Sequence, residues 1–452
     1  MFKLTDSLIH KASPATLAWL VRKSPLPAIR YIAAQRFRQT VRWVGKYSPF
    51  YGRAFAERGI NARSVKTPKD LGDFYTTPED IVANPTDFIC QKPSIVFESS
   101  GTSGKNKQIY YTEQEMCETG LASAIGLFLA GLDQTDRVAN AFDFSIWIPG
   151  MIAHYGLMTS GIFSLAFGKV DPIEVYNRLR EYRFTAVFGE PTWLIRLTEL
   201  TEQKGSYPLK MLLGGAEEIP PDAIAWMERV WAPAKVKMCY GSVELGSTLG
   251  FQPCEHNDGY HMDILDYLPE VMTPDKSGYG ELVITTLCRK TMPLIRYRTR
   301  DIVKMYTEAC PCGLPLPRMS KLRGRCDEMV VSAAGNLYPL MFEKILRPIM
   351  ERACDWQVIF KLSRVREIME IHLESARQDK ETIEVQLRQQ ISQQYPDIMK
   401  NLALGIFEMK LFLHPVGSLR IGRKLKRLID KRYVSQAKES SENPQDEQNE
   451  NE

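Results

Sequence analysis

One pattern recurs through the middle of this chain: a short apolar run ends in glycine and is followed by a helix-forming stretch. It appears at 185–191, 209–217 and 235–241, and a further apolar run occupies 137–142. Short buried strands that alternate with helices are typical of an α/β protein with a parallel sheet. Ligands of such sheets bind at the carboxyl ends of the strands. The residues directly after these runs are therefore candidate binding residues.

The character of the chain changes after about Tyr260. The runs 281–286 and 302–306 are typical of antiparallel strands, and beyond them short helices and strands alternate in a smaller α+β unit. We predict an α/β protein with a large, multi-sheet N-terminal domain over residues 1–326 and a small α+β C-terminal domain over residues 327–435.

The two ends of the chain differ in charge. Met1–Ala54 contains ten Lys or Arg residues and one acidic residue, and its apolar spacing predicts a basic, helical lead-in over residues 1–60. A basic amphipathic helix can contact an anionic membrane surface, but we favour packed helices with a solvated basic face. Residues 436–452 are polar and acidic, and we expect them to form a disordered tail.

Composition limits the class of protein. The chain has 452 residues, of which 44% are apolar and 25% charged, as in a globular protein with a large core. The longest apolar stretch, near Leu121–Leu132, is too short to span a bilayer. Nine cysteines without a secretory signal indicate a cytoplasmic, reducing setting with thiols that are free or bound to a metal. We expect no transmembrane segment and no nucleic-acid partner, and the oligomeric state is left open.

The loop Ser99-Ser100-Gly101-Thr102-Ser103-Gly104-Lys105 lies between two short runs that are typical of strands. Glycine lets the backbone turn its N–H groups inward, and the hydroxyls add donors without bulk, so such a loop can hold phosphate oxygens. Taken alone, the loop is better interpreted as a polar hairpin turn, and only the other motifs of the chain favour a phosphate site. It is not a Walker loop, because Asn106 stands where that motif has Ser or Thr.

Five other stretches occur in a fixed order around this loop. They are Ser48–Tyr51, Tyr240–Glu244, Gly280–Leu287, Met292–Asp301 and Gly324–Met329. Together with the loop they resemble the ANL superfamily of adenylate-forming enzymes, and more narrowly its phenylacetate–CoA ligase-like branch. The resemblance extends from about residue 40 to residue 433.

The resemblance implies an ATP-dependent acid–thiol ligase that works through an acyl-adenylate. A carboxylate resists nucleophiles because it is negative and has no good leaving group, and exchanging one oxygen for AMP supplies that leaving group. The implied cofactors are ATP, Mg²⁺ and either coenzyme A or the pantetheine of a carrier protein. The small domain is expected to be a mobile lid.

The resemblance also implies how ATP is bound. Its β- and γ-phosphates would be held by Ser100, Thr102, Ser103 and Gly104. The adenine would lie against Tyr240 in a pocket that includes Gly214, Gly215, Ala216 and Gly241. Ser242 would lie near the α-phosphate, Asp301 would accept both ribose hydroxyls, and Arg325 would reach the same sugar or phosphate. Glu244 would be a catalytic residue that binds Mg²⁺, a cation that prefers carboxylate oxygens.

The resemblance further implies a catalytic lysine near the C-terminus and a hinge at Asp327. In the stretch 417–427 the family's lysine falls on Lys424, although Arg423 stands where the family has glycine, so Lys426 is left open as the alternative. In related enzymes the small domain rotates at the hinge between adenylation and thiol transfer.

Four residues are candidate zinc ligands. Cys310 and Cys312 form a Cys-x-Cys turn, and Cys254 and His261 lie upstream. Three thiolates and one imidazole would make a closed tetrahedral structural zinc site, of the kind that some phenylacetate–CoA ligase-like proteins carry. The resemblance favours His261 over His256, because His261 occupies the family's Gly-aromatic-His position at the start of a predicted strand. Free thiols in a turn are the alternative.

The substrate pocket is expected to contain Phe142, Phe144 and Gly189. Aromatic residues there suggest an apolar small-molecule carboxylic acid, aryl or fatty. The acceptor is left open between coenzyme A, an acyl carrier protein and a protein cysteine, with coenzyme A as the default of the branch. A non-catalytic nucleotide-binding relative is the other hypothesis left open.

Overall fold

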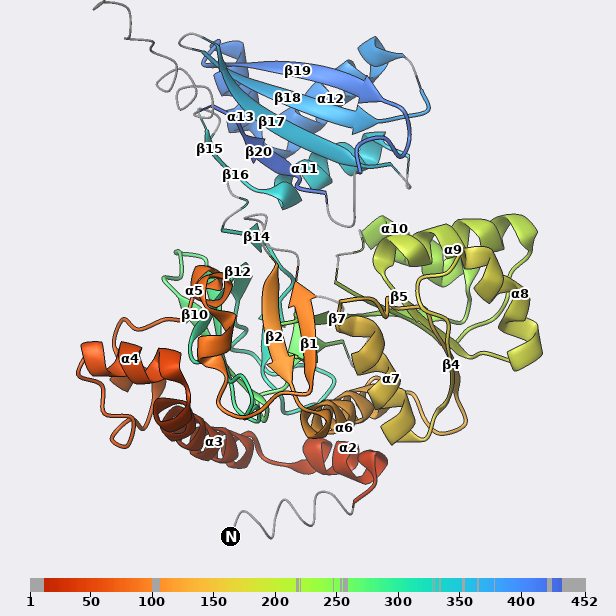
Figure 1. Ribbon diagram of the computed structural model, residues 1–452. Coiled ribbons are helices and arrows are strands. Elements are labelled where there is room, and N and C mark those ends of the chain that lie inside the picture. Colours follow the sequence, from red (N-terminus) through yellow and green to blue (C-terminus); the bar gives the residue numbers. More distant parts are fainter. Residues whose placement is uncertain are drawn as a thin grey trace, which may run out of the picture. The chain divides into compact units, whose positions relative to one another are not determined.

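The computed structural model describes residues 12–99, 106–216, 219, 221–246, 248–252, 254, 259–326, 328, 330–332, 335–351, 354–363, 366–377, 379–420 and 425–432 (Figure 1). The chain forms two compact units, unit 1 over Met1–Lys321 and unit 2 over Leu322–Glu452. The boundary predicted after Cys326 and the mobility of the small domain stay predictions.

The helices of unit 1 are α2 (Pro14–Lys23), α3 (Leu26–Tyr47), α4 (Pro49–Glu57), α5 (Pro78–Ala83), α6 (Glu113–Leu129), α7 (Pro149–Ser160), α8 (Pro172–Tyr182), α9 (Pro191–Lys204) and α10 (Pro221–Val230), with 3₁₀ turns η1 (Pro68–Leu71) and η2 (Pro85–Phe88). Most of them have proline in the first turn, where the missing N–H removes no helical hydrogen bond. For the same reason Pro27 fits inside the first turn of α3, which begins directly after the N-cap residue Pro25.

The strands of unit 1 are β1 (Ile95–Ser99), β2 (Lys107–Tyr111), β3 (Arg137–Asn140), β4 (Phe163–Ala166), β5 (Ala186–Gly189), β6 (Met211–Gly215), β7 (Lys235–Gly241), β8 (Thr248–Phe251), β9 (Gly259–Met262), β10 (Tyr267–Met272), β11 (Tyr279–Thr286), β12 (Tyr297–Lys304) and β13 (Arg318–Ser320). The largest sheet has eight strands in the order β13-β9-β8-β7-β6-β5-β3-β4. Its members β7, β6, β5, β3 and β4 are parallel. The predicted multi-sheet α/β class is confirmed.

Helices cover both faces of this sheet. Figure 1 shows α9 and α10 on one side and α6 and α7 on the other. Because helices cover both faces at the centre of the sheet, β5 is continuously apolar and every one of its residues is buried. In a second sheet, β10, β11 and β12 are antiparallel, as predicted for 281–286 and 302–306. The pair β1–β2 forms an antiparallel hairpin.

Unit 2 contains β14 (Gly324–Arg325), β15 (Val330–Ser332), β16 (Gly335–Leu337), β17 (Trp356–Ser363), β18 (Arg366–Glu374), β19 (Phe407–His414) and β20 (Leu428–Asp430), and the helices α11 (Pro339–Leu346), α12 (Lys380–Gln394) and α13 (Pro396–Ala403), with the 3₁₀ turn η3 (Arg347–Ile349). Its four-stranded sheet has the order β19-β18-β17-β20, and buried residues of the sheet pack with α11, α12 and α13. Within the described part of the chain, no helix combines the length and the apolarity needed to cross a membrane.

Candidate active site

The predicted binding residues of unit 1 follow four neighbouring parallel strands. Phe142 comes after β3, Gly189 ends β5, Gly214–Ala216 end β6, and Tyr240–Ser242 lie at the end of β7. Because these strands are adjacent and parallel, their carboxyl ends meet at one edge of the sheet. The structure therefore brings the expected adenine and substrate residues to the same edge.

The glycines at the end of β6 allow close packing against β7. A Cβ at Gly214 would lie 2.8 Å from Met238 Sδ, and one at Gly215 would lie 2.8 Å from Cys239 Sγ and 3.7 Å from the Phe142 ring. Ala216, the next residue, has φ +75°, a left-handed conformation that is strained for alanine. Such strain is concentrated at functional sites.

Tyr240 and Asp301 meet across the two large sheets of unit 1. The Tyr240 hydroxyl donates to Asp301 Oδ2 at 2.5 Å, and both side chains are buried. Tyr240 is at the end of β7, and Asp301 is on β12, where residues alternate between buried and half-buried. Two residues 61 positions apart, expected to bind adenine and ribose, are thus neighbours.

Glu244 is buried beside the hairpin that carries the predicted phosphate loop. Lys107 Nζ lies 2.8 Å from Glu244 Oε1, the Tyr297 hydroxyl donates to the same oxygen at 3.1 Å, and Ser99 Oγ is 3.5 Å away. Ser99 and Lys107 are paired residues of β1 and β2, so both ends of the loop reach this carboxylate. Burial opposes ionisation, but the Lys107 ammonium outweighs it and lowers the pKa of Glu244 to about 2.

Lys107 and Tyr297 were not predicted as site residues. Lys107 comes two positions after Lys105, on a strand whose direction cannot be read from the loop's composition. Its contact with Glu244 joins residues 137 positions apart. The sequence feature that could have indicated Lys107 as a site residue is weak: a lysine shortly after a Gly/Ser/Thr loop.

Comparisons with known proteins show what this chain is similar to. A family model described as AMP-binding enzyme matches residues 66–283. A phenylacetate–coenzyme A ligase of Thermus thermophilus is 26% identical over 374 residues, which cover 77% of this chain and 82% of that protein. One of Pseudomonas putida is 25% identical over 400 residues, with 84% and 87% covered. Over most of its length the chain therefore resembles the phenylacetate–CoA ligase-like branch of the ANL superfamily.

Two kinds of solved structure have the same fold as this chain. A 2-hydroxyisobutyryl-CoA ligase in the postadenylation state aligns with a TM-score of 0.74 at 20% identity, over 90% of this chain and 91% of that one. An O-succinylbenzoate coenzyme A synthetase of Bacillus subtilis aligns with a TM-score of 0.54 at 17% identity, over 74% and 68%.

Several residues assigned by the ANL resemblance lie outside the described residues. They are Ser100, Thr102, Ser103, Gly104, Asp327 and Lys424, and the alternative zinc ligand His256 is also outside the described residues. Arg325 is described, on β14 of unit 2, and is half-buried. The roles of all these residues stay predictions.

An ion pair that sequence reasoning missed lies at the ends of β4 and β5. Lys169 Nζ is 2.8 Å from Glu190 Oε2, and Glu190 is buried at the start of α9, directly after Gly189. Phe142 is buried, while Phe144 is half-buried with its ring edge-on to His154. The expected substrate region therefore combines aromatic side chains with one charged pair.

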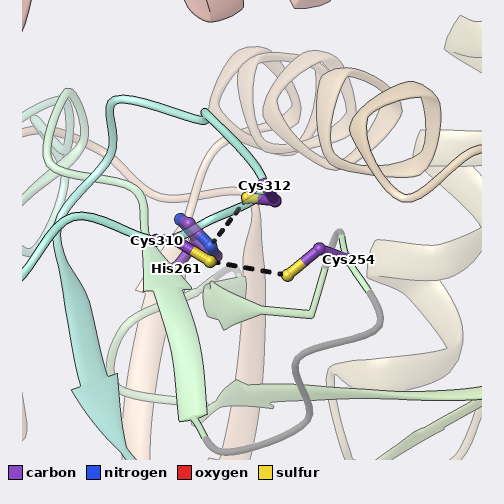
Figure 2. Close-up of side chains that lie close together, drawn as sticks. All are labelled: Cys254, His261, Cys310 and Cys312. Carbon is purple, nitrogen blue, oxygen red and sulfur yellow. Dashed lines mark hydrogen bonds between the residues drawn. The ribbon is translucent and has the colours of Figure 1, made fainter.

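The four candidate zinc ligands lie close together in the structure. Figure 2 shows Cys254, His261, Cys310 and Cys312 pointing toward one another, and their ligand atoms all lie within 4.8 Å of each other. Cys254 follows β8, His261 is on β9, and the two other cysteines occupy the turn between β12 and β13. The cluster thus joins that turn to the β9–β8 side of the eight-stranded sheet.

The spacing of the cluster fits a tetrahedral zinc ion. Zinc bonds of about 2.3 Å to sulfur and 2.0–2.1 Å to nitrogen require tetrahedral edges of about 3.8 Å between two sulfurs and about 3.5 Å between sulfur and nitrogen. Cys254 Sγ and Cys310 Sγ are 3.8 Å apart, and Cys312 Sγ and His261 Nε2 are 3.5 Å apart. His261 Nδ1 lies 3.2 Å from the Leu316 carbonyl oxygen, which leaves Nε2 to face the thiols.

In unit 2, the residues on both sides of the segment that contains Lys424 form ion pairs with Asp355. Asp355 Oδ2 accepts from Arg420 Nε and Oδ1 accepts from Arg427 Nη2, each at 2.7 Å. These two charges lower the pKa of Asp355 in spite of its partial burial. Glu374 accepts from the backbone N–H groups of Asp355 and Leu419. Arg420 and Arg427, which lie on either side of residues 421–424, therefore both bind the carboxylate of Asp355.

Proposed function

We propose that this protein is an AMP-forming acid–coenzyme A ligase that acts through an acyl-adenylate. The carboxylate of the acid attacks the α-phosphorus of ATP and pyrophosphate leaves. A thiol then attacks the acyl carbon of the adenylate, AMP leaves with the bonding electrons, and the thiol proton is released. The observation that carries the proposal is the hairpin β1–β2, whose end residues Ser99 and Lys107 both reach Glu244, close in sequence to Tyr240, which binds Asp301.

Each site residue has a role in the first step. The loop 100–105 would hold the phosphates that leave as pyrophosphate, and Tyr240 and Asp301 would hold adenine and ribose. Ser242 and the strand ends around Gly214 would place the α-phosphate at the edge of the sheet. Lys424 would stabilise the charge of the forming acyl-phosphate.

Glu244 is the residue that would hold Mg²⁺. A buried carboxylate that is ionised at neutral pH is a suitable ligand for this cation, and its neighbour Lys107 supplies a second positive charge toward the phosphates. When bound, Mg²⁺ would neutralise phosphate charge during the displacement. Arg325 and the hinge at Asp327 complete the proposed set.

The acid is proposed to be aryl or fatty. Phe142, Phe144 and Gly189 surround the strand ends, and Glu190 with Lys169 would accommodate one polar substituent. Coenzyme A is the proposed thiol, because the curated relatives are phenylacetate–coenzyme A ligases. A carrier protein or a protein cysteine has no such support. The cytoplasmic location stays a prediction.

Pyrophosphate exchange tests the proposed activity. Purified protein with Mg²⁺ and a panel of aryl and fatty acids should exchange labelled pyrophosphate into ATP, and added coenzyme A should convert the accepted acid into its thioester. Absence of exchange and of adenylate binding across the whole panel would contradict the proposal.

We also propose that Cys254, His261, Cys310 and Cys312 hold a structural zinc ion. Four protein ligands leave no open position, so the ion would fasten the turn 305–317 rather than take part in the reaction.

Glu244→Gln is expected to lower adenylate formation by about 10² and to reduce stability by about 3 kcal/mol. The activity falls because a neutral amide binds Mg²⁺ poorly, and the stability falls because Lys107 loses its buried partner. Pyrophosphate exchange and urea unfolding measure the two effects. The double variant Lys107→Met/Glu244→Gln should recover most of the stability without recovering exchange, whereas joint recovery would assign Glu244 a purely structural role.

The Lys107–Glu244 ion pair is also expected to make the stability of the protein depend on pH in the acid range. Because the pKa of Glu244 is lowered from 4.5 to about 2, its stabilising effect is complete above about pH 4.5 and is lost as the pH falls toward 2. In acid unfolding experiments the Lys107→Met/Glu244→Gln variant should therefore lose less stability than the wild type between pH 5 and 2.

Asp355→Asn is expected to slow adenylate formation about tenfold and to leave thiol transfer from a preformed adenylate within about twofold, because only the first step uses the lysine segment. The half-reactions are measured separately. Glu384→Gln, which breaks a half-buried ion pair with Arg388 in the same unit, is the matched control. Equal slowing of both steps would mean that Asp355 has a general structural role.

A further inference from the structure

Helices α2 and α3 carry a one-sided charge. From Ala12 to Tyr47 the chain has seven basic residues and no acidic residue: Arg22, Lys23, Arg30, Arg36, Arg38, Arg42 and Lys46. Arg36 forms an ion pair with Asp266 on the protein side. This segment therefore presents an almost unopposed positive charge.

The outer face of α3 is polar and basic along its length. Its inner face buries Ile29, Ala33, Phe37, Val41 and Val44 in unit 1. On the opposite face, at spacings of three and four, lie Tyr31, Gln35, Arg38, Arg42 and Lys46. Arg30, in the second turn of α3, is also exposed. A helix with this division could dock on a flat anionic surface.

Exposed aromatic and aliphatic side chains lie among these charges. Trp19 is 58% exposed, Leu20 44% and Tyr31 63%. Trp19 and Lys23 are four residues apart on α2, so they share one face. Tryptophan and tyrosine next to lysine and arginine are typical of segments that lie in the headgroup region of a bilayer.

The two helices are placed to act together. Figure 1 shows α2 and α3 following one another along the same edge of unit 1, with α6 and the strands on their inner side. The inner face of α2 packs against α6 through Leu17 and Ala18. Their outer faces therefore form one surface, here called the α2–α3 face: Trp19, Leu20, Lys23, Arg30, Tyr31, Arg42 and Lys46.

We propose that the α2–α3 face docks on membranes that contain anionic lipids. A second copy of the chain is a poor occupant, because pairing this face with itself would oppose like charges. An acidic protein would satisfy the charges, but a lipid surface also accommodates the exposed rings of Trp19 and Tyr31. This binding is independent of the proposed ligase activity.

Vesicle sedimentation of the full-length protein tests the proposal. The protein should sediment with vesicles of phosphatidylcholine that contain about 30% phosphatidylserine, and not with phosphatidylcholine alone. Binding should weaken strongly between about 0.1 M and about 1 M salt, because the Debye length falls from about 10 Å to about 3 Å. Lys23→Gln/Arg30→Gln/Arg42→Gln should reduce the partition coefficient about 100-fold, at roughly fivefold for each lost charge.

Two further variants distinguish binding through the α2–α3 face from nonspecific attraction by positive charge elsewhere on the protein. Arg196→Gln/Lys204→Gln/Arg229→Gln removes three exposed charges from α9 and α10 and should bind vesicles like the wild type. Trp19→Ser/Tyr31→Ser should weaken binding without changing the melting temperature, since both rings are largely exposed. Equal binding to neutral vesicles, equal loss in the α9–α10 control, or binding of an acidic carrier protein in place of vesicles would overturn the proposal.

Discussion

Replacing Lys424 with alanine is expected to lower the rate of acyl-adenylate formation by about 10²–10³. In the proposed reaction its ammonium lies against oxygens that gain charge as the carboxylate attacks the α-phosphate, and alanine removes that stabilisation only in the transition state. Thiol transfer from preformed acyl-adenylate should remain within a few-fold of the wild-type rate. Single-turnover measurement of each half-reaction gives the two rates.

Lys426→Ala is the matched control, because it removes the same charge two residues further along. The backbone carbonyl of Lys426 accepts from Gln357 Nε2 in unit 2, a contact that alanine keeps. We expect a small effect on both steps. If Lys426→Ala alone abolishes adenylation, the catalytic position is Lys426, and if neither variant affects it, the proposed lysine role is wrong.

Replacing Cys310 with serine is expected to release the proposed zinc ion and to lower the melting temperature by about 5 °C or more. Serine is a poor zinc ligand at neutral pH, and the turn between β12 and β13 loses the ion that ties it to Cys254 and His261. Elemental analysis should find one zinc per chain in the wild type and little in the variant. Thermal unfolding measures the stability.

Cys117→Ser provides the control for this experiment. Cys117 is an exposed free cysteine on α6, and its replacement should leave both the zinc content and the melting temperature unchanged. A wild-type protein without zinc, with the four residues intact, would contradict the zinc proposal. The ligase proposal is separate, since none of these four residues belongs to the proposed nucleotide site.

Strand ends were the most predictable part of the site. Apolar runs that finish in glycine locate β5, β6 and β7, and the rule that parallel strands bind ligands at their carboxyl ends places Gly189, Gly214 and Tyr240 on one edge. Both facts are local in sequence, because burial on two faces requires continuous apolar residues. The order of the strands in the sheet is not local, and it decides which of these ends are neighbours.

Charged contacts over long sequence distances were not predictable. Glu244 was identified by its motif, but its partners Lys107 and Tyr297 come from other sheets. No sequence pattern identified Asp355, because its role depends on its ion pairs with both Arg420 and Arg427. An ion pair depends on where two side chains end in space, and residue type alone does not determine that.

The amino-acid sequence by itself determined the α/β class, the order of the adenylation motifs and the identity of the four Cys/His residues. These depend on short-range patterns: periodic apolar residues, glycines at turns and fixed motif spacing. Only the tertiary structure decided that the ligand atoms of Cys254, His261, Cys310 and Cys312 lie within 4.8 Å of one another, that Tyr240 binds Asp301, and that the ends of the predicted phosphate loop reach Glu244. Those contacts join distant segments, and the packing of strands and sheets sets their geometry.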